Sequence, residues 1–64
     1  MNLTPEELAK DPNTPLKILK ELAKTSKDEV ILAAIAENPN TDADLLIELF
    51  EKYPYQVLNN PAIE

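Results

Sequence analysis

The sequence predicts an all-α protein, a short α-solenoid of stacked helices with about two and a half repeats. Two loops are alike: 11–14 reads Asp-Pro-Asn-Thr and 38–41 reads Asn-Pro-Asn-Thr, 27 residues later. Aligning residues 8–30 with 35–57 gives eight identities in 23 positions. A period of about 20–50 residues indicates units that contact mainly their neighbours. We expect one domain over 1–64, with copies at about 8–34 and 35–61 and a partial third copy from 59.

Prolines set the expected helix boundaries. A proline disfavours helical geometry in the residue before it, so helices should end near Asp11, Asn38, Tyr53 and Asn60. The ranges that follow are 5–10, 15–25, 27–37, 42–52 and a short helix at 54–59. The apolar run near residue 30 could pass for a buried strand, but Ala33 and the capping signals around it favour helix. No strand is predicted.

Hydroxyl and acidic residues mark the expected helix starts. We expect the hydroxyls of Thr14 and Thr41 to accept hydrogen bonds from the first turn of the next helix, with Pro15 just inside the start. In a capping box, a Ser or Thr and a Glu three residues later satisfy each other's backbone N–H groups. Two are predicted, Thr4 with Glu7 and Ser26 with Glu29.

The apolar faces predict what packs. In the second helix the inward residues should be Leu16, Ile18, Leu19, Leu22 and Ala23. Residues 30–36 are apolar without interruption, which indicates a helix covered on more than one side. In the repeat register Ile47 takes the place of Lys20, which should face water. Ile47 is therefore expected on an outward face and is a candidate contact residue, although a single exposed aliphatic residue is also common.

The C-terminal end is the second candidate contact region. Repeat arrays need polar terminal caps, and apolar residues follow the last helix boundary with no further helix to cover them. The end should pack on another molecule, including a second copy of the chain, or belong to a longer array. Interfaces favour tyrosine, but packing on the adjacent helix also explains the two tyrosines beside Pro54. The candidate protein-contact residues are Ile47, Tyr53, Tyr55, Leu58 and Ile63.

Charge limits the partners. Six lysines, no arginine and twelve acidic residues give a net charge of −6, of which residues 35–64 carry −5. Nucleic acids are gripped mainly by lysine and arginine, so neither nucleic acid nor a membrane surface is an expected partner. The acidic half either solubilises the chain or steers it to a basic protein.

Composition also excludes chemistries. Cysteine, histidine and glycine are absent, which removes thiolate metal sites, thiol nucleophiles and Gly-rich phosphate loops. Asp44 and Glu48 share a helical face and could form a weak cation site, but a solvated acidic face explains them better. We expect no catalytic residue, no metal and no cofactor. No signal-peptide pattern or membrane-spanning run is present, so we expect a cytoplasmic protein.

The segment 31–41, Ile-Leu-Ala-Ala-Ile-Ala-Glu-Asn-Pro-Asn-Thr, resembles the leucine-rich repeat variant motif, V-R-x-A-V-A-x-N-P-x-T-P. Residues 53–62 resemble the H/Y-P-x-x-V-L-x-N-P-A segment of related bacterial proteins. The resemblance implies a right-handed superhelix of short helices, some of them 3₁₀, and interaction surfaces instead of a catalytic activity. Leu32 and Asp42 depart from the motif's Arg and Pro. Some members carry an iron–sulfur cluster, which a chain without cysteine cannot bind.

These observations predict a non-enzymatic protein–protein interaction module, a small helical-repeat scaffold that can also associate with itself through its C-terminal end. The alternative is a small acidic inhibitor or immunity-type protein that covers a basic site on its target. Salt-sensitive binding would distinguish the acidic inhibitor from a scaffold that binds through apolar contacts.

Overall fold

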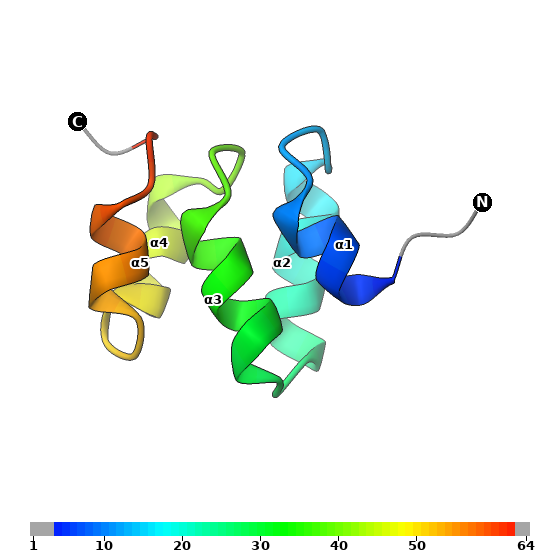
Figure 1. Ribbon diagram of the computed structural model, residues 1–64, viewed down its shortest axis with the longest axis horizontal. Helices are drawn as coiled ribbons and strands as arrows, with labels where there is room; N and C mark the ends of the chain where they lie inside the picture. The colour runs from blue at the N-terminus through cyan, green and yellow to red at the C-terminus, as the bar shows by residue number, and fades with distance from the viewer. Residues whose placement is uncertain (1–3, 63–64) are drawn as a thin grey trace.

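The computed structural model describes residues 4–62, which form five helices arranged in two layers (Figure 1). Helices α1 (Pro5–Lys10), α3 (Glu29–Glu37) and α5 (Pro54–Leu58) lie side by side in the front layer of the view. Helices α2 (Leu16–Thr25) and α4 (Ala43–Phe50) lie behind them. The described residues contain no strand, and the all-α prediction is confirmed.

Helix α3 occupies the centre of the array. It packs against α1 and α5 in its own layer and against α2 and α4 in the other. This agrees with the expectation that an uninterrupted apolar helix is covered on several sides. The order of packing is compatible with the predicted solenoid, and the right-handed superhelix stays a prediction.

The core runs along the seam between the two layers. Ile35 in α3 and Leu19 in α2 are completely buried, and Val57 extends the core to the C-terminal helix. Alanines on α1 and α3 let these helices approach closely, since a methyl group takes little space. The buried apolar residues are Ala9, Leu19, Ala34, Ile35, Ala36, Leu45, Leu46, Leu49 and Val57.

Of the two predicted capping boxes, one is present. Thr4 Oγ1 accepts from the N–H of Glu7 at 3.2 Å, and Glu7 Oε1 accepts from the N–H of Thr4 at 3.1 Å. The box predicted for Ser26 is wrong because Ser26 is the C-cap of α2, and its N–H donates to Leu22 O at 2.8 Å. Asp28 caps α3 instead, accepting from the N–H of Val30. Helix α3 therefore begins two residues later than predicted.

The threonines of the two similar loops do not cap the helices that follow them, contrary to the prediction. Their hydroxyls are buried and donate to the preceding helix, Thr14 to Leu8 O and Thr41 to Ile35 O, each at 2.7 Å. The last carbonyls of a helix have no partner within it, and a hydroxyl can satisfy one of them. Pro15 is the N-cap of α2, without a side-chain bond, and Asp42 caps α4.

Two expectations about side-chain faces have opposite outcomes. Ile18 was expected inward and is 37% exposed, because α2 buries Leu19 and leaves its neighbour at the edge of the seam. Ile47 was expected outward and is 69% exposed. The repeat alignment predicted exposure better than the helical face did, because it assigned Ile47 the outward position of the equivalent residue, Lys20.

Candidate interaction surface

The three loops that follow α1, α3 and α5 lie along one edge of the array, at the top of Figure 1. Each begins with an acid or amide whose Oδ1 accepts from the N–H two residues later. Asp11 accepts from Asn13 at 2.9 Å, and Asn38 from Asn40 at 2.8 Å. Asn60 accepts from Ala62, also at 2.8 Å. This Asx geometry holds each loop in the same turn.

The two asparagines also connect neighbouring loops. The Asn38 side-chain amide donates to Ala9 O at 2.8 Å and to Asp11 O at 2.9 Å. The Asn60 amide makes the same pair of bonds one loop further on, to Ala36 O and Asn38 O, both at 2.8 Å. Both asparagines are fully buried. We call this series of side-chain-to-carbonyl bonds the asparagine ladder.

The ladder shows how the third loop aligns with the others. Asn38 lies 27 residues after Asp11, but Asn60 lies only 22 after Asn38, so five residues are missing before the third loop. In the alignment that these bonds give, Val57 takes the position of Ile35 and is likewise buried, at 3% exposed. The alignment of Val57 with Val30 in the 27-residue register is therefore wrong; Val30 is 53% exposed. The deletion shortens α5 to Pro54–Leu58.

An apolar groove of about 270 Å³ lies between α4 and α5 at the C-terminal end of the array. Ile47, Phe50 and Leu58 line it with 69%, 45% and 63% of their surfaces exposed. Thr41, Ala43, Leu46, Val57 and Ala62 complete the lining. We call this groove and its rim the C-terminal face. Exposed contiguous apolar surface of this kind is typical of a binding site.

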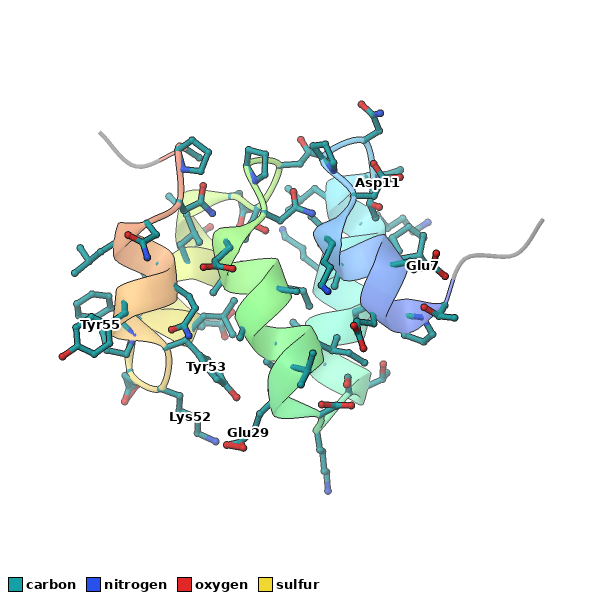
Figure 2. The ribbon with its side chains drawn as sticks, in the orientation of Figure 1. Glu7, Asp11, Glu29, Lys52, Tyr53 and Tyr55 are labelled. Carbon is teal, nitrogen blue, oxygen red and sulfur yellow. The ribbon has the colours of Figure 1, made fainter. Side chains whose placement is uncertain are left out.

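The structure brings together some of the predicted contact residues and separates others. Ile47 and Leu58 line the same groove. Tyr53 is half-buried against the core and lines a different groove with Glu29 and Lys52; Figure 2 shows its ring between α5 and α3. Tyr55 is 78% exposed on the outer side of α5 (Figure 2). Ile63 lies outside the described residues.

Sequence reasoning missed Phe50 as a surface residue. It is not among the predicted contact residues, but it is nearly half exposed and lies in the groove beside Ile47. A signal was present: Ala43, Ile47 and Phe50 follow the i, i+4, i+7 spacing of one helical face. Leu45, Leu46 and Leu49 already account for the buried face.

The acidic residues of α4 face lysines on α2. Lys20 Nζ lies 3.4 Å from Asp42 Oδ2, an ion pair between the two repeats. Lys20 and Lys24 also line one groove together with Asp44 and Glu48. The surface is therefore mixed in sign, and the excess negative charge of the second half is partly compensated where the two repeats meet.

Residues 4–62 contain neither a cluster of metal ligands nor a membrane-spanning helix. No group of three or more acidic side chains there is arranged to hold a metal ion, and Asp44 and Glu48 face Lys20 and Lys24. In the same range no helix has the length and apolarity needed to cross a bilayer.

Two carboxyl groups cap helices and have lowered pKa values. The Asp42 pKa is below its ordinary value chiefly because the carboxylate accepts from the N–H of Leu45, and Lys20 lowers it further. The Glu7 pKa is lowered by the N–H and hydroxyl of Thr4. A carboxyl whose pKa is lower in the folded than in the unfolded chain stabilises the fold above its unfolded pKa. That stabilisation is lost as the pH falls through both values.

Asp42→Asn is therefore expected to make stability less dependent on pH. Asparagine caps a helix about as well as aspartate but does not titrate. Between about pH 7 and about pH 3, melting followed by circular dichroism should show a smaller fall in Tm for Asp42→Asn than for the wild type. Asp44→Asn, an exposed residue on the same helix, is the control and should follow the wild type. An equal fall in Tm for all three proteins would contradict the assignment.

The repeated loops and the ladder indicate a repeat protein, and comparison with known families identifies which one. The Leucine Rich Repeat Variant domain matches residues 4–64. This chain belongs to the leucine-rich repeat variant family. No curated protein and no solved structure matches it at a significant level. The resemblance carried by residues 31–41 and 53–62 is thereby confirmed.

Membership in the leucine-rich repeat variant family gives meaning to one departure from its motif. Asp42 stands where the motif has proline, and it has a structural role as the N-cap of α4 and the partner of Lys20. Members of the leucine-rich repeat variant family are repeat scaffolds. In this chain the C-terminal face is the end of the scaffold where large apolar side chains are exposed together.

Proposed function

We propose that this chain is a non-enzymatic scaffold that binds another protein through its C-terminal face. The observation that carries the proposal is the groove lined by Ile47, Phe50 and Leu58, three large apolar side chains exposed together at one end of the array. Burying such side chains contributes about 1.5–3 kcal/mol each relative to leaving them in water. Aromatic and aliphatic anchors in a groove are also what concentrates binding energy at interfaces.

The family supports a scaffold over an enzyme, because repeat domains of this kind generally provide surfaces and not reactions. The residue types agree with this, since the chain contains no histidine or cysteine to act as a base or nucleophile. We include self-association in the proposal, because the same face can meet its counterpart on a second copy.

The alternative, an acidic inhibitor of a basic target, has weaker support. Its acidic surface would be centred on α4, but two of the acids there share a groove with Lys20 and Lys24, and Asp42 is paired with Lys20. A basic partner would have to compete with these lysines. The apolar groove needs no such rearrangement.

The test compares two substitutions of exposed aliphatic residues. We expect Ile47→Lys to weaken capture of the natural partner from cell extract by at least about tenfold, because one lost apolar anchor and one desolvated ammonium together exceed 1.4 kcal/mol. Val30→Lys is the matched control, since Val30 is 53% exposed on α3, away from the groove. It should capture the partner like the wild type.

Binding that survives Ile47→Lys undiminished would contradict the proposal. For the self-association part, the measurement is the mass in solution by sedimentation. A dimer that dissociates in Ile47→Lys and persists in Val30→Lys is expected, whereas a monomer at all protein concentrations would rule self-association out.

A further inference from the structure

We propose that the C-terminal face takes a helical-repeat unit of another polypeptide, whose loop asparagine donates its side-chain amide to the main-chain carbonyls of Leu58 and Asn60. We further propose that Glu7 and Asp11 prevent the N-terminal end of a second copy of this chain from stacking on the C-terminal face. The inference deepens the proposed function, on which it rests, by naming the kind of partner and the residues that select it.

The first step is an open pair of acceptors. In the ladder, each asparagine donates to two carbonyls of the preceding loop. Asn60 donates to Asn38 O, at its own equivalent position, and to Ala36 O, two residues before that position. The corresponding pair in the third loop is Leu58 O and Asn60 O. No described residue donates to either oxygen.

The carbonyl at the loop position can accept two bonds at once. Asn38 O accepts both from the Thr41 N–H, at 3.1 Å, and from the Asn60 amide, at 2.8 Å. Asp11 O likewise accepts from Thr14 and from Asn38. A carbonyl oxygen has two lone pairs, so Asn60 O can take an incoming amide whatever else the loop bonds to it.

The second step is the apolar surface beside these acceptors. Ile47 and Phe50 lie 27 residues after Lys20 and Ala23, and in the first repeat those two α2 residues share a groove with α4. The part of the next repeat that lines this groove with α2 is therefore α4, through Leu45 and Leu49. The same step along the array would place a helix beside Ile47 and Phe50. The interface already present inside the chain thus specifies the shape and chemistry of the occupant.

The third step is the chemistry of the opposite end. Asp11 takes the position of Asn38 and Asn60 in the ladder, and a carboxylate can accept but not donate. Glu7 lies 27 residues before Ala34, which is buried against the neighbouring helices, whereas Glu7 is exposed and ionised within its capping box. Figure 2 shows Glu7 and Asp11 on the α1 end of the array, away from α5. Head-to-tail stacking would bring the Asp11 carboxylate onto the carbonyls of Leu58 and Asn60 and bury Glu7, and both changes are unfavourable.

The experiment uses a copy whose N-terminal end is altered to allow stacking and whose C-terminal face is blocked by a lysine. The probe is the chain with Glu7→Ala, Asp11→Asn and Ile47→Lys, and its comparison is the chain with Ile47→Lys alone. Each is titrated into the wild-type chain by calorimetry, and the complex is sized by sedimentation. We expect one probe to bind one wild-type chain, in place of the second wild-type copy, at least about tenfold tighter than the comparison, because the substitution at Asp11 supplies the missing amide.

One control variant isolates the cause. Glu29→Gln and Glu37→Gln, added to Ile47→Lys, remove the same charge from α3 and should bind no better than Ile47→Lys alone. If the probe does not fold by circular dichroism, Glu7→Gln replaces Glu7→Ala, since glutamine can complete the capping box. Equal binding of probe and comparison, or no binding of the probe up to about 1 mM, overturns the inference.

The result is separable from that of the proposed function. A natural partner that is lost with Ile47→Lys would support the C-terminal face as a binding surface even if the probe fails, and then only the asparagine-donor partner is wrong. If the probe binds while no partner depends on Ile47, the selection by Glu7 and Asp11 stands and the proposed function fails.

Discussion

Asn38→Asp is expected to lower the free energy of unfolding by at least about 3 kcal/mol at neutral pH. The substitution keeps the size of the side chain and the Oδ1 that accepts from Asn40, but it removes both amide bonds to Ala9 O and Asp11 O. It also buries a carboxylate against two carbonyl oxygens. A chain of 64 residues has a total stability of about 3–10 kcal/mol, so the variant should lose at least about 12 °C in Tm.

The pH dependence of Asn38→Asp distinguishes the cause. Oxygen neighbours without a donor raise the pKa of a carboxyl in the folded chain. The electrostatic part of the penalty is therefore absent below the unfolded pKa and grows as the pH rises from that value to the raised one. The gap in Tm between variant and wild type should therefore narrow below about pH 4. Asn59→Asp is the control, because Asn59 is exposed next to Asn60; its effect should stay within about 0.5 kcal/mol. A loss independent of pH, or equal losses at both positions, would contradict the ladder.

Ile35→Ala is expected to cost about 2–5 kcal/mol, since Ile35 is completely buried in the central helix and the neighbours cannot close around the lost atoms. This is a large part of the chain's total stability, and the variant should be partly unfolded at 37 °C. Urea unfolding followed by circular dichroism at 222 nm measures it as a fall in the midpoint with an unchanged slope.

Val30→Ala is the matched control for Ile35→Ala. Val30 lies on the same helix but is 53% exposed, and alanine has the higher helix propensity, so its effect should stay below about 1 kcal/mol. Comparable losses at the two positions would mean that α3 is not buried from the Ile35 side.

Helix type and approximate range could be predicted because both depend on local chemistry. Prolines end helices through their own backbone geometry, and the Thr4–Glu7 box lies within four residues, so α1 was predicted with its bounds, 5–10, as the structure has them. The starts of α2 and α3 were less accurate. Whether Thr14 caps forward or donates backward to Leu8 O depends on how the loop folds over α1, which the residues around it do not determine.

The asparagine ladder could not be predicted, because its bonds join residues 22 to 29 apart and end on main-chain atoms. Asparagine is common in turns, so the presence of Asn38 and Asn60 in loops needed no further explanation. Their bonds to the neighbouring loop therefore had no signal in the sequence. The repeat register succeeded for Ile47, where the two copies have equal length. It failed for Val57, because five residues are missing before the third loop. Aligning Asn60-Pro61 with Asn38-Pro39, 22 residues earlier, places Val57 with Ile35.

For the candidate site, exposure of Ile47 and Leu58 followed from the register and from the uncovered C-terminal end. Phe50 was missed because an aromatic residue among leucines is usually assigned to the core. Only the spacing of Ala43, Ile47 and Phe50 along one helical face indicates otherwise. Tyr53 is not part of this surface. Its ring packs against the core, which agrees with the alternative explanation that the tyrosines beside Pro54 pack on the adjacent helix.

Because the Asn38 and Asn60 amides bond to main-chain oxygens only, the side chains of Ala9, Asp11 and Ala36 take no part in these bonds. Every amino acid has the same carbonyl at those points. Units of this construction can be duplicated, lost or exchanged between genes without compensating changes in the ladder, and their outer surfaces are free to diverge.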